Sequence, residues 1–321
     1  MGIDLWQTRA PTPSFLARTG SKDRELWRVL AFPVLWSSVG LLIGAVLYFT
    51  AMSFSDELSR LFPTTAYGLR AAPLGRVRAD QVAPNLGLMG EARRLLLIAA
   101  GPAGFAISTP LIGRWLMQRP ALTWFTAAHR FRWRMLLAGL VMYCAATGLM
   151  MVVGGLANGF PKSPPLFRAD EPLHVRAVYL VVSTVALLAA AAAEEVILRG
   201  WLLQQTAAFT RKLLIVLALN AVLFAFIHLD RDPLRNVALF ASGVCLGVIA
   251  LRTGGLEFGI GVHAGNNLML AWFVATFPLG DLNGQMRLGD LIAQLIVTFS
   301  GLGLAELTVR WRPLRRIAFW T

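Results

Sequence analysis

The sequence predicts an all-α protein, a polytopic transmembrane helix bundle of about eight spans. The first observation is composition, because 56% of the 321 residues are hydrophobic and only 15% are charged. A soluble globular domain averages about 45–50% apolar and about 25% charged residues. This shortage of charge excludes a disordered chain, a disulfide scaffold and an ordinary cytosolic enzyme. The other observations are a series of long charge-free runs and the gathering of Lys and Arg in the gaps between them.

Eight apolar runs approach the roughly 17–25 residues with which a helix crosses a bilayer. The fourth run stops at Glu194 and Glu195 and then resumes, so we expect that helix to continue through Arg199 to about Thr206. Between the first two spans, residues 56–94 are expected to form an external loop, a re-entrant element or a cap. The spans cover residues 29–55, 95–113, 135–161, 177–193, 213–229, 236–251, 258–280 and 291–305.

An even number of spans places both ends of the chain on one side of the membrane. The basic loop 130–134 and the basic tail 310–316 favour the cytoplasm for that side, which predicts a multi-pass inner (plasma) membrane protein with cytoplasmic termini. The net charge of +13 comes without basic segments that carry interleaved aromatics, so no nucleic-acid partner is expected. The predicted parts are a cytoplasmic segment (1–28), a membrane region of three spans without an assigned motif (29–170), a motif-bearing core (171–280), and a last span with its tail (281–321).

Ionisable side chains inside membrane spans are costly and are functional-site candidates by default. Three pairs lie four residues apart and so share a helix face, namely Glu195 with Arg199, Phe224 with His228, and His263 with Asn267. A glycine pair, Gly243 and Gly247, is predicted to let helices pack closely inside the bundle. The candidate polar residues are Glu194, Glu195 and Arg199 in the fourth span, His228 at the end of the fifth, and His263, Asn266 and Asn267 in the seventh.

The depth of these residues follows from their distance to the turns between helices. Glu194 and His228 are equally far from residue 211, so we expect them to face each other at one level. His263 follows its own turn by only about two helical turns, so tilt or an irregular start of its helix is needed to bring it to that level.

The residue types point to hydrolysis of a peptide bond within the membrane. A carboxylate without a partner in a low-dielectric site suits a general base acting on water. The two histidines could bind a metal together with Glu194, hold the attacking water, or donate to an oxyanion. An asparagine amide is also a good oxyanion donor.

Three motifs carry a resemblance to a known family. Glu194 to Arg199 reads EExxxR, Phe224 to His228 reads FxxxH, and His263 to Asn267 reads HxxxN. In this order on hydrophobic spans they resemble the CAAX protease and bacteriocin-processing (CPBP, Abi) intramembrane proteases, which include the type II CAAX prenyl endopeptidases. The resemblance covers about residues 171–280.

The resemblance implies an all-helical fold of about eight spans and a role for each motif residue. Glu194 corresponds to the glutamate that activates water, and His228 assists it. His263 and Asn267 correspond to the pair that stabilises the oxyanion, while Glu195, Arg199 and Phe224 support the site. Family members are classed as metalloproteases, and a metal-free glutamate mechanism has also been put forward. Both options therefore stay open: no cofactor, or a divalent metal such as zinc held by Glu194, His228 and His263.

The implied partners are the lipid bilayer and a membrane-embedded or lipid-anchored peptide or protein substrate. Three other classes of intramembrane protease do not fit, because the chain has no HExxH, GxSG or GxGD motif. Two other functions remain open from the sequence. One is a membrane protein that binds peptides without cutting them, as an immunity protein or scaffold, and the other is a proton-coupled transporter.

Overall fold

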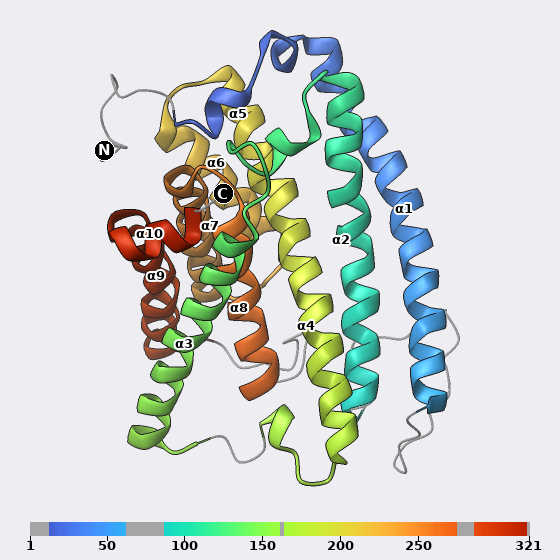
Figure 1. Ribbon diagram of the computed structural model, residues 1–321, viewed down its shortest axis with the longest axis vertical. Coiled ribbons are helices and arrows are strands. Elements are labelled where there is room, and N and C mark those ends of the chain that lie inside the picture. The colour runs from blue at the N-terminus through green and yellow to red at the C-terminus, as the bar shows by residue number, and fades with distance from the viewer. Residues whose placement is uncertain (1–12, 62–86, 161–163, 275–285, 320–321) are drawn as a thin grey trace.

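The computed structural model describes residues 13–61, 87–160, 164–274 and 286–319. Their regular structure is helical (Figure 1), apart from one isolated antiparallel bridge between Thr126 and Gly255, which confirms the predicted all-α class. Most of the predicted loop 56–94 lies outside the described residues. The longer helices are α1 (Leu26–Leu61), α2 (Leu88–Leu116), α3 (Trp133–Asn158), α4 (Leu173–Glu195), α6 (Leu213–Ile227), α7 (Pro233–Thr253), α8 (Glu257–Phe273) and α9 (Leu288–Arg310).

Six segments of the described chain are long and apolar enough to cross a membrane, so the prediction of eight was too high. Helices α6 and α8 fall short with 15 and 17 residues, which extend over roughly 22–26 Å of a ~30 Å hydrocarbon core. Helix α6 stops because the chain turns at Leu229, which has a left-handed φ of 50°. Asp232 then caps α7 by accepting two backbone N–H groups of its first turn. Helix α8 ends at Phe273, and residues 275–285 of its predicted span lie outside the described residues.

The outer surface of the bundle is apolar. On α1, for example, Leu41, Leu42 and Phe49 are 63%, 67% and 59% exposed. In a soluble monomer a large patch of this kind marks an interaction surface, and on helices of membrane-crossing length it is the surface that faces lipid. The six long apolar helices thus indicate a multi-pass membrane protein.

The fourth span is longer than its apolar run. Helix α4 continues into a π-helix, η6 (Val196–Leu203), and then into α5 (Gln204–Phe209), and Leu173–Phe209 counts as one span of 37 residues. The expected continuation beyond Glu195 is confirmed. In a π-helix the hydrogen bonds join residues five apart, and such segments are frequent at functional sites. The π-helix of this chain starts directly after the two glutamates.

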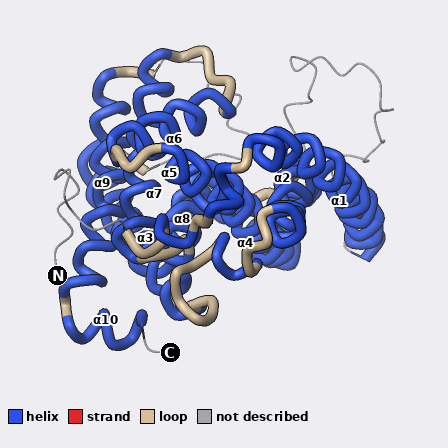
Figure 2. Tube along the Cα trace, turned by 90° about the horizontal axis from the view of Figure 1, so that it is seen from above, coloured by secondary structure: helices blue, strands red, loops and turns tan. Residues whose placement is uncertain are grey.

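Helix α8 lies at the centre of the bundle (Figures 1 and 2), where it contacts α3, α4 and α7. Helices α1 and α2 pack together at one edge and reach the centre through α4, whereas α6, α7 and α9 cover the other side. The start of α1 lies at the upper end of the bundle in Figure 1. Residues 257–265 of α8 are all buried, so the central helix is enclosed by its neighbours over its first half.

The backbones of neighbouring helices approach closely at two glycines, which fixes the positions of α6 and α8 in the bundle. A Cβ on Gly261 of α8 would lie 2.2 Å from the carbonyl oxygen of Leu136 in α3, so only glycine fits there. A Cβ on Gly243 of α7 would lie 2.7 Å from Cα of Ala221 in α6, which confirms the predicted packing role of that glycine. Small residues at such contacts let membrane helices pack backbone to backbone.

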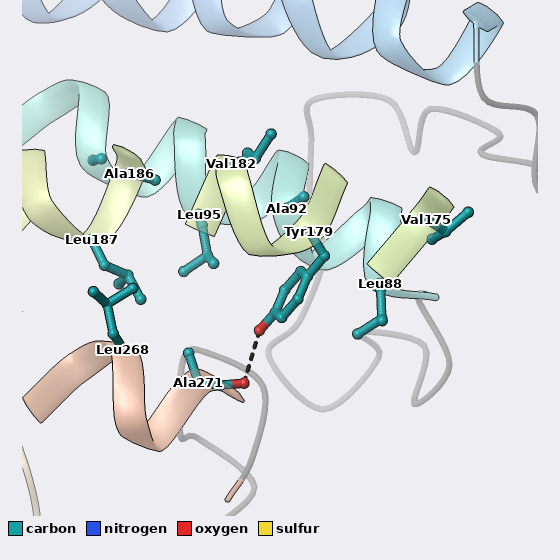
Figure 3. Close-up of a cluster of buried hydrophobic side chains, with 11 residues drawn as sticks. Leu88, Ala92, Leu95, Val175, Tyr179, Val182, Ala186, Leu187, Leu268 and Ala271 are labelled. Carbon is teal, nitrogen blue, oxygen red and sulfur yellow. Dashed lines mark hydrogen bonds between the residues drawn. The ribbon is translucent and has the colours of Figure 1, made fainter. Parts of the chain in front are cut away.

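An apolar cluster joins α2, α4 and α8 (Figure 3). Leu95, Leu187 and Leu268 contribute one side chain from each of these helices. Tyr179 of α4 is fully buried in the cluster, and its hydroxyl donates a 3.0 Å hydrogen bond to the carbonyl oxygen of Ala271. The cluster fixes the far half of α8 against α4.

A stack of aromatic rings joins α1 to the π-helix. The ring of Phe32 in α1 lies 5.1 Å from that of Trp201 in η6 and 6.2 Å from that of Trp124 in η4 (Ala121–Trp124), measured between centroids. The rings of Trp36 and Trp201 are 5.6 Å apart and nearly parallel. Because such pairs add stability beyond the area they bury, the first helix stabilises the position of the π-helix.

Arg132 and Glu257 form a buried ion pair, here called the clamp, where α3 and α8 begin. Arg132 donates through Nη2 to Oε2 of Glu257 (2.6 Å), through Nε to Oε1 (2.9 Å), and through Nη1 to the carbonyl oxygen of Thr253 (2.8 Å). The two side chains are 7% and 0% exposed. The predicted basic loop 130–134 therefore presents only part of its charge at the surface.

Candidate active site

The site is built around His263 of α8. Its Nδ1 lies 3.0 Å from Oε1 of Glu195, and its Nε2 lies 3.7 Å from Oε2 of Glu194. Oε1 of Glu195 also accepts a 3.0 Å hydrogen bond from Nη1 of Arg199. A carboxylate in that role only accepts, so Nδ1 of His263 carries the proton that it shares with Glu195. The EExxxR and HxxxN motifs thus meet in space.

Glu194 and Glu195 have different surroundings although they are adjacent in the sequence. The side chain of Glu195 is 1% exposed and is bound by Arg199 and His263. The side chain of Glu194 is 25% exposed, and its Oε2 is a buried atom without a hydrogen-bond partner among the described residues. A polar atom in that state is costly to bury, and the exposed part of the same side chain lets water or substrate reach the carboxylate.

Arg199 connects the pair to two further helices. Its Nη2 donates to the carbonyl oxygen of Gly243 in α7 (3.1 Å), and its guanidinium lies 4.6 Å from the ring centroid of Phe224 in α6. The side chain is completely buried. The structure therefore contains the ion pair expected from the spacing of Glu195 and Arg199, and it fixes that pair inside the bundle.

Phe224 lies between the two histidines. Its ring centroid is 4.7 Å from that of His228 and 6.0 Å from that of His263. Nδ1 of His228 lies 2.7 Å from the carbonyl oxygen of Phe224. Because a carbonyl oxygen only accepts, Nδ1 carries the proton and Nε2 remains an acceptor. His228 is exposed at the end of α6.

The histidine nearest to Glu194 differs from the one that the depth estimate suggests. His263 lies within ion-pair distance of Glu194, whereas in the described chain no ion pair joins Glu194 to His228. The estimate required tilt or an irregular start of the helix for His263, and the structure has a left-handed turn with φ of 72° at Gly254, after which α8 starts with buried residues. His263 consequently reaches the two glutamates early in its helix.

Asn267 lies one turn after His263 on α8, and residues at this spacing share a helix face. Its Oδ1 accepts a 3.4 Å hydrogen bond from Nδ2 of Asn266. The side chain is partly exposed. The amide therefore points to the same side of α8 as His263.

Sequence reasoning missed Asn220, a polar residue in the middle of the apolar helix α6. It is 1% exposed, and its Nδ2 donates a 2.7 Å hydrogen bond to the carbonyl oxygen of Leu198 in the π-helix. π-Helical pairing changes which carbonyl groups need a partner, and Asn220 binds one of them next to Arg199. The signal was present, since a lone amide in an otherwise apolar span meets the same criterion as the other candidates.

The residues proposed to hold a metal are only partly brought together. Glu194 and His263 approach to 3.7 Å, and Nδ1 of His263 is hydrogen-bonded to a carboxylate, as is usual for a metal-ligating histidine. A zinc site takes at least three protein ligands, and the described residues contain no group of three or more His, Cys, Asp or Glu side chains arranged to hold a metal ion. The donor set does not fit a zinc centre, so no step is derived through a metal.

Residues 176–269 match the family model for the type II CAAX prenyl endopeptidases described as Rce1-like. The matched segment runs from α4 to α8 and includes every residue of the charge cluster around His263. This segment is an Rce1-like domain. The resemblance that the three motifs predict is confirmed, within slightly narrower limits than residues 171–280.

The similarity to a known protein extends beyond the Rce1-like domain. The uncharacterized protein YyaK of Bacillus subtilis (strain 168) is 27% identical over 261 residues, which cover 78% of this chain and 79% of that protein. Because this alignment is longer than the Rce1-like domain, it includes helices that flank the domain. No solved structure matches the chain.

Proposed function

We propose that the protein is an intramembrane endopeptidase that cuts a membrane-associated protein or peptide with glutamate-activated water. The observation that carries the proposal is the unequal state of two adjacent carboxylates. Oε2 of both glutamates is buried without a hydrogen-bond partner among the described residues, but Glu195 is 1% exposed and is neutralised by hydrogen bonds from Arg199 and His263, whereas Glu194 is 25% exposed and has neither of these hydrogen bonds. The Rce1-like domain supports peptide-bond hydrolysis as the reaction.

In the proposed mechanism each group acts on a stated atom. The carboxylate of Glu194 takes one proton from a water molecule while the water oxygen attacks the scissile carbonyl carbon. Nε2 of His228 accepts a hydrogen bond from the second hydrogen of that water. His263, in its imidazolium form, donates through Nε2 to the oxyanion, and Asn267 donates through Nδ2. When the C–N bond breaks, the proton on Glu194 passes to the leaving amine, so the products are a carboxyl and an amine terminus.

For the substrate we propose a membrane-embedded or lipid-anchored peptide. The matching family is named for prenylated CAAX sequences, and the site lies among helices whose outer surface is apolar. We also propose the inner membrane as the location, with cytoplasmic termini. In support, α10 (Arg312–Phe319) follows the last span directly and exposes Arg312, Arg315 and Arg316, as cytoplasmic segments do.

The test is cleavage of internally quenched peptides that end in a CAAX sequence, with and without an S-farnesyl group, by the full-length protein in detergent. We expect Glu194→Gln to lower kcat by about 10²–10⁴-fold, the usual contribution of a general base, and to leave thermal stability close to that of the wild type. Glu306→Gln is the matched control, because that side chain is 27% exposed and pairs with Arg252 away from the site. The control variant keeps wild-type kcat.

A chelator added to the same assay separates the two chemical options. Unchanged activity favours glutamate-activated water without a metal, and lost activity that zinc restores favours a metal. A wild type that leaves every peptide intact, or a Glu194→Gln variant as active as the wild type, contradicts the proposed function. Peptide binding without cutting would support a scaffold or immunity protein instead.

A further inference from the structure

We propose that Tyr143 and Asn266 are positioning residues that orient the side-chain amide of Asn267. The proposal rests on the proposed function, in which Asn267 donates to the oxyanion. Tyr143 lies in α3, within the region 29–170 to which the sequence assigns no motif and outside the Rce1-like domain. Asn266 occupies an unspecified position of the HxxxN motif.

Three side chains form a directed chain of hydrogen bonds. The hydroxyl of Tyr143 donates to Oδ1 of Asn266 at 3.3 Å, and Nδ2 of Asn266 donates to Oδ1 of Asn267 at 3.4 Å. In the first step the hydroxyl faces the oxygen end of the Asn266 amide, which leaves Nδ2 of that amide to donate to Asn267. The second step then sets the orientation of the Asn267 amide.

The direction of the chain matters for catalysis. An asparagine amide has an accepting end and a donating end, and only its Nδ2 can stabilise a negative oxygen. Since Oδ1 of Asn267 is occupied as an acceptor by Asn266, Nδ2 is left for the reacting group. A rotated amide would present its carbonyl oxygen to the oxyanion and oppose the reaction.

The ring of Tyr143 is held firmly, so its hydroxyl has a fixed position. The residue is 2% exposed. A Cβ added to Gly265 of α8 would lie 3.3 Å from Cδ1 of the ring, and one added to Gly301 of α9 would lie 3.2 Å from Cε2. The ring thus fills the space between α8 and α9, which explains why α3 can position a residue on the central helix.

Tyr143→Phe is the test variant, and the chain offers a matched control. Tyr179 is also fully buried and also donates its hydroxyl to α8, but to the backbone carbonyl of Ala271 (Figure 3). With the peptide that the wild type cuts fastest, we expect Tyr143→Phe to lower kcat roughly tenfold with KM unchanged. That loss is smaller than the roughly 10²–10³-fold loss expected for Asn267→Ala, which removes an oxyanion donor. Tyr179→Phe loses a similar hydrogen bond and keeps the wild-type kcat.

The double variant Tyr143→Phe/Asn267→Ala decides whether the tyrosine acts through the asparagine. We expect it to be no slower than Asn267→Ala alone, because a positioning residue has no effect once its target is gone. A further loss of kcat in the double variant, or equal kcat for Tyr143→Phe and Tyr179→Phe, overturns the proposal. Asn266→Ala breaks the same chain of hydrogen bonds and replaces Tyr143→Phe if that variant fails to fold. If the wild type and Glu194→Gln cut equally well, the proposed function fails instead.

Discussion

Two buried clusters of charged side chains each include one residue of the central helix α8, Glu257 in one and His263 in the other. They differ in how many of their polar atoms have a hydrogen-bond partner. In the clamp both carboxylate oxygens of Glu257 accept from Arg132, which also binds the carbonyl oxygen of Thr253. In the site cluster, formed by Glu194, Glu195, Arg199 and His263, three buried atoms have no hydrogen-bond partner among the described residues. They are Oε2 of each glutamate and Nε of Arg199.

The difference distinguishes an ion pair that only stabilises the fold from a cluster whose carboxylates can still bind water or substrate. Buried polar atoms in proteins are almost always hydrogen-bonded, so exceptions need an explanation. The clamp has no spare acceptor on its carboxylate and joins the starts of α3 and α8. In the site cluster one oxygen of each glutamate has no partner among the described residues, and Glu194 is half-buried. A carboxylate in this state can act on a water molecule.

The largest effect is expected from breaking the clamp. Glu257→Gln leaves the buried Arg132 without a counter-charge, which should lower the free energy of unfolding by about 3–5 kcal/mol. Activity per folded molecule should stay at the wild-type level, since Glu257 does not contact the site cluster. Thermal unfolding in detergent, followed by the reaction of the buried thiol of Cys245 with a dye, measures the loss. A stable Glu257→Gln protein with reduced kcat would reverse the assignment of the two clusters.

A glycine between the clamp and the site gives the next largest effect. Gly261→Ala places a methyl group 2.2 Å from the carbonyl oxygen of Leu136, so α3 and α8 must separate at a cost of about 1–3 kcal/mol. Gly259→Ala is the matched control two residues earlier, where the nearest atom to the new methyl is Oε2 of Glu195 at 3.6 Å. The same thermal measurement should find the control within about 0.5 kcal/mol of the wild type. Equal losses for the two variants would show that helix propensity, not backbone contact, determines the result.

Replacing each ion pair with apolar residues sharpens the comparison. Arg132→Met/Glu257→Leu and Arg199→Met/Glu195→Leu both remove a buried pair completely, so stability should stay within about 1 kcal/mol of the wild type. Only the second double variant should lose peptidase activity, because it also releases Nδ1 of His263. Stability and kcat measured together on the two proteins check this expectation. Loss of activity in both would mean that the clamp also takes part in the reaction.

The smallest effect is expected from an exposed ion pair. Arg60 lies 3.2 Å from Glu57 at the end of α1, and their side chains are 78% and 57% exposed. Pairs of this kind contribute about 0–1 kcal/mol, so Arg60→Ala should leave the melting temperature and kcat nearly unchanged. A large shift in the melting temperature would show that this surface is covered in the folded protein.

The helices and the ion pair within EExxxR could be predicted because they depend on local patterns. Apolar runs mark the spans, and the spacing of Glu195 and Arg199 predicts their ion pair. The clamp could not be predicted, because Arg132 and Glu257 are 125 residues apart in the sequence and nothing local distinguishes Arg132 from its basic neighbours. Two of the eight expected spans are shorter than expected: α6 ends at the turn at Leu229, and residues 275–285 of the α8 span lie outside the described residues.

The π-helix also depends on distant contacts. Residues 196–203 combine leucines with the poor helix former Gly200, and their altered pairing is accompanied by Asn220 at the carbonyl oxygen of Leu198 and by the rings stacked on Trp201. Such partners come from other helices, so no window of the sequence contains them. The position of His263 beside Glu194 likewise depends on the left-handed turn at Gly254, which changes where α8 starts in the bundle.

The ring stack between α1 and the π-helix gives the protein an optical signature. The indoles of Trp36 and Trp201 are 5.6 Å apart with an angle of 24° between their planes, close enough for their far-ultraviolet transitions to couple, and we expect a circular dichroism couplet from this pair. That couplet exists only while the first helix is seated against the Rce1-like domain. During extraction from the membrane, its disappearance at constant helix content would therefore report that α1 has come away.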